Sequence, residues 1–511
     1  MTEPALSIEP RLTLSQLLEG MAVAPALPVT GITTDSRDVE RGDVFLACRG
    51  ETRHGLAFLD QVIEDGAAAV VWDGHPSLPA PGKQRVPVIE VPGLGDRLGE
   101  IANRFFDAPS RQMTVAGVTG TNGKTTVAWL LAQCLRRAGL QCGYVGTLGA
   151  GLVETDLHAG LTTPACIDLH RRLAAFRAAG AYRAALEVSS HGLRQQRIDG
   201  VHFDSAIFTN LSRDHIDYHG DMQRYGATKA SFVLREDIPH HIINIDDPFG
   251  LTLAERSRRE SGVTPTVVST LASKIEDFDS YVKLGIVARD DAGTSVDAHT
   301  SWGDAALRLP LVGHFNVANA ALVLAQLLCW GVPFADAAAA LRRATPPPGR
   351  LQRVVREAVA GQPAVYVDYA HTPGGLEAVL QALRPHCAGR LWCVFGCGGD
   401  RDRGKRRIMG ATAGALADCP IVTSDNPRSE SPGDIIAEIL AGMAGDAVAI
   451  EDRAAAIAYA IGNARTDDVV LIAGKGHETV QVIGDHRLPF SDYAVAQEYL
   501  AARVPTSVEK R

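Results

Sequence analysis

The sequence has little that would tie it to membranes, nucleic acids or an oxidising compartment. Its nine cysteines are dispersed along 511 residues, and none forms a Cys-x-x-Cys pair. An odd and scattered set predicts reduced thiols in the cytoplasm rather than a disulfide framework or a zinc site. Basic residues are not in excess, because 50 Lys and Arg stand against 59 Asp and Glu, a formal net charge of -9. We therefore expect no general attraction to nucleic acid or to an acidic membrane surface.

Long uninterrupted hydrophobic runs are also missing. The most apolar stretch, from Val317 to Leu341, is broken by Asn319, Gln326 and Pro333. This pattern predicts a buried helix and a loop rather than a membrane span. The first ten residues, "MTEPALSIEP", have neither the basic start nor the apolar core of a signal peptide. The expected location is the cytoplasm, with no membrane insertion.

The chain is long enough for several domains, and its strand and helix patterns divide it into three. Residues 1–111 give short strands such as "DVFLACRG", "AAAVVWD" and "PVIEVP", typical of a small α/β domain. Residues 112–347 begin with an apolar strand, a glycine loop and a helix, and from about 264 to 312 they suggest a β insertion. Residues 348–511 alternate strands with helices, which predicts a doubly wound, mostly parallel sheet.

The segment "GVTGTNGKTT", Gly117 to Thr126, is similar to a phosphate-binding loop, although Val118 stands where the usual pattern has its first glycine. Gly120 and Gly123 permit close approach of the backbone, so that N–H groups can face phosphate oxygens. A tight strand-to-helix turn without a ligand is the alternative. Because Gly-Lys-Thr-Thr follows an apolar strand and opens a helix, nucleotide binding is favoured.

Polar residues close two further apolar strands of the central region. Glu187 ends "RAALEV", and a carboxylate beside a phosphate loop can be a second Mg²⁺ ligand. "TNLSRDHIDYHG" places Asp214, His215, Asp217 and His219 just past another strand. A metal or phosphate site and a solvated polar loop both remain open for this cluster.

The nucleotide loop does not identify the group that receives the phosphate. No Asn-Lys-x-Asp guanine reader is present, so a GTPase is not indicated. A kinase acceptor site is neither shown nor excluded. A switch or assembly ATPase of the P-loop class also remains possible at this point.

A resemblance to a known family rests on ten short motifs that occur in one order. They are "GTNGKTT", "TTP", "EVSSHGL", "TNLSRDHIDYHG", "YGATKASF", "GHFNVANA", "VDYAHTP", "FGCGGDRDRGKR", "DNPR" and "AGKGHE". From about Thr34 to Glu478 the chain resembles the Mur ligase family. The resemblance implies an α/β protein with a central P-loop ATPase-type sheet and a C-terminal Rossmann-like sheet. It also implies an ATP-dependent amide ligase that phosphorylates the D-glutamyl carboxylate of a UDP-linked muramoyl dipeptide and joins 2,6-diaminopimelate to it.

The resemblance further implies roles for individual residues. The phosphate loop and its partners would bind ATP: Gly120, Thr121, Asn122, Gly123, Lys124, Thr125, Thr126, Asn319, Arg350, Asp368 and His371. The UDP-muramoyl dipeptide would meet Ser36, Glu51, Thr52, Arg53, Thr162, Thr163, Ser189, Gln195 and Arg197. Diaminopimelate would meet Arg401, Asp425, Asn426, Pro427, Arg428, Gly474 and Glu478. Mg²⁺ would be held by Thr125, Glu187, His215 and Lys229, and the catalytic residues would be Lys124, Lys229 and His215.

Two positions are special within this resemblance. Lys229 matches a lysine that is carboxylated by CO₂ in the family, whereas a lone helix lysine is ordinarily exposed and unmodified. Leu161 replaces an asparagine that some relatives carry before "TTP", which puts one hydrogen bond to the sugar-peptide in doubt. A folylpolyglutamate synthetase shares the loop and the acyl-phosphate chemistry. The UDP-site matches and "DNPR" argue against that alternative.

Overall fold

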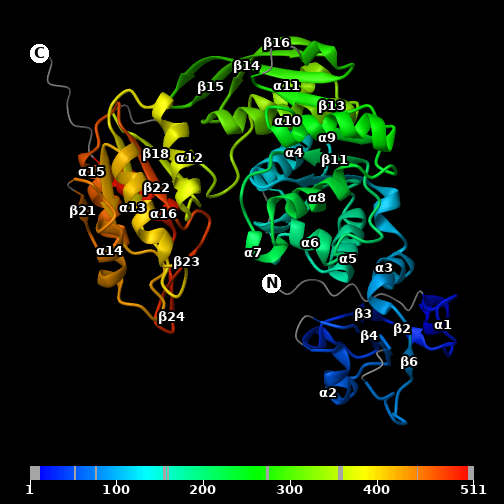
Figure 1. The fold of residues 1–511 in the computed structure, drawn as a ribbon. Coiled ribbons are helices and arrows are strands. Elements are labelled where there is room, and N and C mark those ends of the chain that lie inside the picture. Colours follow the sequence, from blue (N-terminus) through cyan, green and yellow to red (C-terminus); the bar gives the residue numbers. More distant parts are fainter. Residues whose placement is uncertain are drawn as a thin grey trace, which may run out of the picture. The chain divides into compact units, whose positions relative to one another are not determined.

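The structure of the chain is a computed structural model (Figure 1). It divides into two compact units. It describes residues 12–50, 53–74, 78–153, 157, 160–271, 275–354, 361–445 and 447–503. The first unit comprises the chain up to Thr121, Gly139–His241 and Arg256–Val263. The second comprises Asn122–Ala138, Ile242–Glu255 and the chain from Thr264 onward. The three-domain boundaries expected from the sequence remain a prediction.

The first unit begins with a small parallel sheet whose strand order is β3-β4-β5-β6. Its central strands are rich in Val, Phe, Leu and Ala, and they are buried on both faces, as parallel strands usually are. The three short strands expected in the first hundred residues are therefore confirmed. The elements of this region are β1 (Leu12–Thr13), α1 (Leu14–Leu17), β2 (Pro28–Val29), β3 (Gly31–Thr33), β4 (Asp43–Ala47), α2 (Leu59–Glu64), β5 (Ala69–Trp72), β6 (Val88–Glu90) and α3 (Leu98–Phe106).

A second sheet in the first unit runs in the order β11-β7-β10-β8-β9, and only the β8–β9 pairing is antiparallel. The pairing aligns Glu187 with Val118 and Phe208 with Thr119. The carboxyl ends of β7, β10 and β11 therefore meet at one edge, where ligands of parallel α/β sheets gather. The elements are β7 (Thr114–Thr119), β8 (Gly143–Gly146), β9 (Gly149–Leu152), α5 (Cys166–Ala178), β10 (Arg183–Glu187), α6 (Ser190–Arg194), β11 (Ser205–Phe208), α7 (Ile216–His219) and α8 (Met222–Val233).

The second unit contains the helix that follows the glycine loop and the expected β insertion. Strands β12, β13 and β14 are parallel, whereas β14, β15 and β16 form antiparallel hairpins. The most apolar stretch of the sequence forms two helices, and none of the described helices is long and apolar enough to span a bilayer. The elements are α4 (Lys124–Arg137), β12 (His240–Asn244), α9 (Pro248–Arg256), β13 (Thr266–Ser269), β14 (Tyr281–Asp290), β15 (Gly293–Thr300), β16 (Gly303–Leu309), α10 (His314–Cys329) and α11 (Phe334–Leu341).

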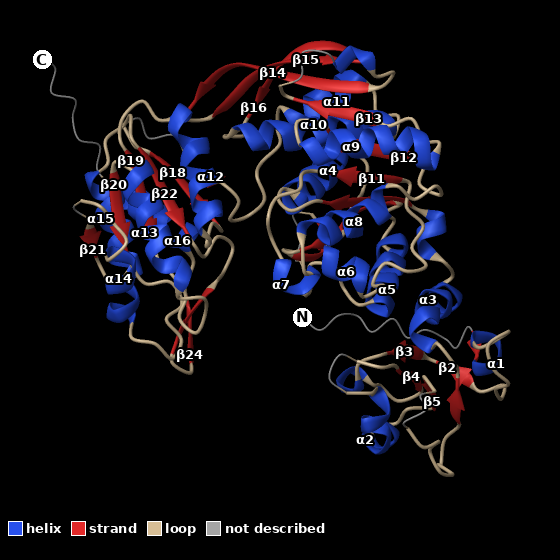
Figure 2. Cartoon of the chain, viewed as in Figure 1, coloured by secondary structure: helices blue, strands red, loops and turns tan. Residues whose placement is uncertain are grey.

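The last sheet is doubly wound, as expected, with the order β17-β18-β22-β19-β20-β21 (Figure 2). Alternate strand residues face two separate cores, one under α12, α13 and α14 and the other under α15 and α16. Two features were not expected: β21 is only two residues long, and a hairpin of β23 and β24 follows β22. The elements are β17 (Gln352–Arg353), β18 (Ala364–Asp368), α12 (Pro373–Leu383), β19 (Leu391–Phe395), α13 (Gly404–Leu416), β20 (Cys419–Val422), α14 (Pro432–Leu440), β21 (Val448–Ala449), α15 (Arg453–Asn463), β22 (Val469–Ala473), β23 (Val480–Ile483), β24 (His486–Pro489) and α16 (Asp492–Ala502).

All nine cysteines are free thiols, and most are buried. Burial disfavours the thiolate, so it raises the pKa of Cys142 and of Cys393 to about 12. Neither is a reactive nucleophile at neutral pH.

Candidate active site

Two positions of the glycine loop, Gly120 and Gly123, have no room for a side chain. Gly120 has φ 146°, and a Cβ there would lie 1.9 Å from Thr209 Oγ1. Gly123 has φ 88°, and a Cβ there would lie 2.6 Å from Asn319 Oδ1. Val118 is a buried strand residue of β7 rather than part of the turn. The first glycine of the turn is therefore Gly120, two positions later than in the usual pattern, and the backbone of the loop is held close to its neighbours.

In the first unit, the start of the loop is anchored by hydrogen bonds from the strand ends around it. Thr121 N donates to Asn210 O at 2.8 Å, and Ser212 N donates to Thr121 Oγ1 at 3.0 Å. Lys229 Nζ donates to Gly120 O at 2.7 Å and lies 4.5 Å from the ring centroid of Tyr225. Lys229 is 1% exposed, so it is not an ordinary exposed helix lysine.

In the second unit, α4 starts at Lys124 with Gly123 as its N-cap and without a side-chain cap. Thr125 and Thr126 are buried in its first turn, and Lys124 is half-buried. Asn319 of α10 stands against Gly123, and its Nδ2 donates to Asn316 Oδ1 at 3.1 Å. A helix N-terminus of this kind presents N–H groups and a positive dipole end to an anion.

Glu187 closes β10 as a buried carboxylate with a fixed orientation. Its Oε1 accepts from Tyr144 Oη at 2.7 Å and from Thr147 N at 2.8 Å. Its Oε2 lies 3.2 Å from Thr147 Oγ1. Glu187 is 1% exposed, and the small Gly146 makes room for it. Tyr144 and Thr147 were not singled out from the sequence, since they lie about 40 residues away in β8 and its turn.

The residues expected to hold the muramoyl dipeptide lie in one hydrogen-bonded group next to Glu187. Thr163 Oγ1 donates to Glu187 O at 2.7 Å and accepts from Ser189 N at 3.0 Å. Arg197 Nη1 donates to Thr163 O at 2.8 Å, and Arg197 also contacts Gln195. The hydroxyls of Thr162 and Thr147 lie 3.1 Å apart. The structure thus brings together all five of these predicted residues in the first unit.

The histidine-rich stretch forms an aromatic cluster. The ring of His191 stacks on Tyr218 at 4.1 Å and meets His215 edge-on at 4.8 Å. His215 adopts a left-handed φ of 52°, and its Nε2 lies 3.4 Å from Asp214 Oδ2. His219 is buried, and neither of its ring nitrogens has a hydrogen-bond partner among the described residues. Burial lowers the pKa of His191 and of His219.

A cavity of about 1010 Å³ lies between the small sheet and α5 in the first unit. Ser36 and Arg53 line it, as does Leu161, the departure noted in the sequence. Glu51 and Thr52 lie outside the described residues. Arg171 and Arg172 of α5 also line the cavity. Sequence reasoning had not singled out these two arginines.

Three predicted ATP residues gather around Tyr369 in the second unit. The guanidinium of Arg350 lies 4.8 Å from the ring centroid of Tyr369, and the ring of His371 lies 4.6 Å from it. Asp368 accepts from Leu351 N at 2.7 Å and from Ala370 N at 2.8 Å. Burial raises the pKa of Asp368, although Arg350 and these two N–H groups act to lower it. Burial also lowers the pKa of His371.

The "DNPR" segment follows β20, where it forms the rim of the last sheet. Arg428 has a left-handed φ of 53°, and its Nη1 donates to Gly399 O at 2.7 Å. Its backbone pairs with the unexpected hairpin, since Arg428 N donates to Val482 O at 3.0 Å. Asn426 Nδ2 donates to Glu478 Oε2 at 2.8 Å. Gly474, at φ 119°, lies against Asp425, where a Cβ would be 2.6 Å from Oδ2.

Arg401 is exposed, and its Cγ would lie 3.9 Å from a Cβ at Gly398. Arg428 Nη1 would lie 2.9 Å from the same Cβ. Gly398 therefore marks a point that both arginines approach. The two predicted arginines, Asp425, Asn426, Pro427, Gly474 and Glu478 thus belong to one neighbourhood.

A buried ion pair supports this rim from behind. Arg453 bonds Asp492 twice, each time at 2.7 Å, and both side chains are 0% exposed. Arg453 also donates to Ser424 O at 3.2 Å and to Ala473 O at 2.9 Å. These carbonyls directly precede Asp425 and Gly474. One guanidinium therefore ties the ends of β20 and β22 to the start of α16.

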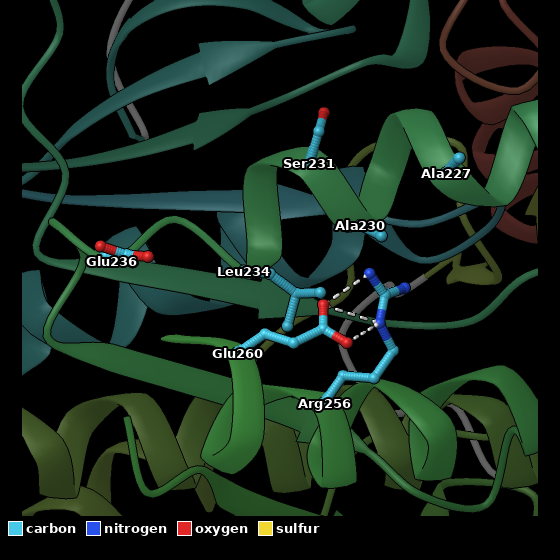
Figure 3. Close-up of a pocket in the computed structure, with 7 residues that line it drawn as sticks. All are labelled: Ala227, Ala230, Ser231, Leu234, Glu236, Arg256 and Glu260. Carbon is cyan, nitrogen blue, oxygen red and sulfur yellow. Dashed lines mark hydrogen bonds and ion pairs between the residues drawn. The ribbon is translucent and has the colours of Figure 1, made fainter. Parts of the chain in front are cut away.

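A smaller cavity of about 310 Å³ lies beside α8 and holds none of the predicted site residues (Figure 3). Its most polar feature is the ion pair of Arg256 and Glu260, with 2.9 Å between Nη2 and Oε2. Hydrogen bonds from Arg256 and Arg259 lower the pKa of Glu260 to about 2. The charges of Arg256 and Glu260 are satisfied within the protein, so this ion pair does not mark a binding site.

Three family models match the chain in sequence order. The Mur ligase family, catalytic domain, matches residues 28–106; the Mur ligase middle domain matches 118–327; and the Mur ligase, glutamate ligase domain, matches 349–476. The chain is 45% identical over 480 residues to the UDP-N-acetylmuramoyl-L-alanyl-D-glutamate--2,6-diaminopimelate ligase of Chromobacterium violaceum. The aligned region covers 93% of this chain and 95% of that protein. The chain belongs to the Mur ligase family.

Other Mur ligases are similar along the same length. The enzyme of the same name from Xylella fastidiosa is 45% identical over 496 residues, with 96% of this chain and 97% of that protein covered. A solved structure of a UDP-N-acetylmuramoyl-L-alanyl-D-glutamate--2,6-diaminopimelate ligase has a TM-score of 0.71 and 30% identity. It covers 96% of this chain and 99% of that one. The resemblance that the ten motifs carried is confirmed.

Proposed function

We propose that this Mur ligase uses ATP to add meso-2,6-diaminopimelate to the D-glutamyl carboxylate of UDP-N-acetylmuramoyl-L-alanyl-D-glutamate, a step of peptidoglycan precursor synthesis in the cytoplasm. The observation that carries the proposal is the 45% identity, over 93% of the chain, to an enzyme of that name. "DNPR" and its neighbours Glu478 and Gly474 lie together at the rim of the last sheet, which supports the choice of amino acid.

The proposed chemistry explains why a phosphate loop serves an amide ligase. A free carboxylate repels nucleophiles and has no leaving group. Transfer of the γ-phosphoryl group gives an acyl phosphate and ADP, after which the amine attacks and phosphate leaves. Lys124 and the first turn of α4 would hold the ATP phosphates, and charge stabilisation of this kind is usually the largest catalytic contribution.

The few protein donors available at the site suit a Mg²⁺ ion that would be held mainly by the phosphates of the substrate. Among the described residues, no group of three or more His, Cys, Asp or Glu side chains is arranged to hold a metal. Mg²⁺ in phosphate sites takes one or two carboxylates and keeps several waters. The oriented carboxylate of Glu187 and the hydroxyl of Thr125 suit that role, and His215 would complete the proposed set. The ion would neutralise charge on the phosphates.

Lys229 is proposed to carry a carbamate. Carbamate formation needs a neutral amine, and burial generally makes lysines lose their proton more readily. A carbamate nitrogen keeps one N–H, which can retain the bond to Gly120 O. We expect Lys229→Ala to be nearly inactive and to recover partly with short carboxylic acids. High-resolution density of active protein with bicarbonate checks this independently, and an unmodified amine there would contradict it.

A coupled phosphate-release assay tests the proposed function. It combines ATP, the muramoyl dipeptide nucleotide and a panel of amino acids. We expect phosphate release only when ATP, the nucleotide and diaminopimelate are all present. Release without the nucleotide would favour a P-loop switch ATPase. Equal turnover of L-lysine would remove the proposed specificity and leave the ligase activity. Glutamate addition to a folate would favour the folylpolyglutamate synthetase alternative.

A further inference from the structure

Lys475 is a buried cation in the middle of the proposed amino-acid site, and no role has been assigned to it. It follows β22 in "AGKGHE", and its side chain is 0% exposed. Its Nζ donates to Asn426 Oδ1 at 3.0 Å, to Glu478 Oε2 at 3.0 Å and to Val480 O at 2.7 Å. An ammonium has three N–H groups, so every donor of Lys475 is used.

These bonds fix the orientation of the Asn426 amide. Its Oδ1 accepts from Lys475 Nζ and also from Val482 N at 3.0 Å. A flipped amide would place N–H groups against both of these donors, so the flip is excluded. Asn426 Nδ2 must then point toward Glu478, and it donates to Oε2 at 2.8 Å.

The same bonds also fix Glu478 and leave it one oxygen for a ligand. Oε2 accepts from both Lys475 and Asn426, whereas Oε1 has no hydrogen-bond partner within the described part of the chain. The side chain of Glu478 is 32% exposed, so part of it can be reached. Charge-assisted bonds of this kind restrict a carboxylate to one orientation.

We infer that Lys475 is a positioning residue, which sets Asn426 and Glu478 for recognition of the amino-acid substrate. The inference rests on the proposed function, because that function makes Asn426 and Glu478 substrate contacts. Lys475 offsets the charge of Glu478 before substrate arrives and directs Oε1 outward. The incoming ammonium then meets a carboxylate that is already oriented, so little ordering is left to the binding step.

Lys475→Met tests the inference, with the exposed Lys83→Met as the matched control. We expect the KM for diaminopimelate to rise about tenfold or more and kcat to change less than about threefold, because a ground-state contact is disturbed. The KM values for ATP and for the nucleotide should stay unchanged in both variants. A role in folding alone would instead lower the active fraction and leave the KM for diaminopimelate unchanged, which would overturn the inference.

A double-mutant cycle separates positioning from a direct contact. In a Glu478→Gln background, Lys475→Met should raise the KM for diaminopimelate by much less than in the wild type, because the two changes act on one interaction. Equal effects in both backgrounds would overturn the inference. If wild-type protein ligates no diaminopimelate at all, the proposed function itself fails, which is a different outcome.

A measurement on the unaltered protein decides the matter if Lys475→Met does not fold. The ammonium of a buried, triply bonded lysine exchanges slowly enough to be followed by nuclear magnetic resonance after ¹⁵N-lysine labelling. Addition of diaminopimelate should shift the Lys475 signal, and addition of a non-hydrolysable ATP analogue alone should not. No shift at saturating diaminopimelate, in protein that turns over, would overturn the inference.

Discussion

At the scale of single residues, two glycines at opposite ends of α4 allow the effect of backbone strain to be distinguished from the effect of a steric contact at the site. Both have positive φ, 88° at Gly123 and 80° at Gly139. A Cβ at Gly123 would meet Asn319, whereas a Cβ at Gly139 would meet nothing within 4 Å. The same substitution therefore has the same backbone cost at both ends and a different steric cost.

We expect Gly139→Ala to lower the free energy of unfolding by ~1–2 kcal/mol, the cost of a left-handed alanine. Gly123→Ala should lower it by at least as much, because its Cβ also meets Asn319. Only Gly123→Ala should raise the KM for ATP, by about tenfold or more, because the loop shifts away from Asn319. Urea unfolding and steady-state kinetics measure the two effects. A similar KM for ATP in both variants would show that the contact with Asn319 does not set the loop.

Arg428 is expected to select the substrate. Its planar guanidinium is held by Gly399 O and can pair with the distal carboxylate that distinguishes diaminopimelate from lysine. We expect Arg428→Ala to raise the KM for diaminopimelate by about a hundredfold and to shrink its advantage over L-lysine. The exposed Arg487→Ala is the control. Unchanged selectivity in competition assays would count against this role.

At the scale of elements, α5 presents two arginines to the large cavity. Arg171 Nη2 donates to Ile32 O at 2.9 Å, and Arg172 Nε lies 2.9 Å from Asp168 Oδ2. If the cavity takes the UDP moiety, as expected from the sequence for Ser36 and Arg53, these cations would offset the charge of its diphosphate.

We expect Arg171→Ala and Arg172→Ala each to raise the KM for the nucleotide substrate by about tenfold, with a weaker salt dependence than the wild type. Arg177→Ala, on the same helix and paired with Asp107, should have no such effect. Kinetics at two ionic strengths measure this. Equal KM values for all three variants would place the diphosphate elsewhere.

Elements with strong local patterns were predictable from the sequence, and long-range pairings were not. The strands that became β7, β10, β18, β19 and β22 are continuous apolar runs, and the glycine loop marked its own helix. The hairpin of β23 and β24 has mixed polarity, and its role depends on Arg428, more than 50 residues earlier. The bonds of Lys475 to Asn426 likewise join residues 49 positions apart. A single sequence carries no signal for such contacts.

At the scale of the whole molecule, buried histidines link stability to pH. Among the described residues, burial is the largest cause that lowers the pKa of eight histidines. They are His170, His191, His219, His240, His241, His371, His386 and His477. The unfolded chain then binds more protons than the folded one below the ordinary histidine pKa of 6.5. Stability is fully present above that pH and is lost as pH falls.

We expect the urea midpoint to decrease as the pH is lowered from 7.5 to 5.5. The free energy of unfolding should decrease by ~1.4 kcal/mol per pH unit for each proton taken up on unfolding. His386 is a good probe, because its Nε2 accepts from Gly313 N at 3.1 Å and a protonated ring could not. His386→Gln should flatten the pH dependence, whereas exposed His486→Gln should not. A midpoint independent of pH across this range would contradict the assignment.

The ion pair of Arg453 and Asp492 connects α16 to the proposed amino-acid site, although neither residue belongs to that site. Deleting α16 would leave the Arg453 guanidinium buried without its carboxylate, and the carbonyls of Ser424 and Ala473 would lose their common anchor. We therefore expect that shortening the protein into α16 changes the selection of the amino acid as well as the stability of the fold.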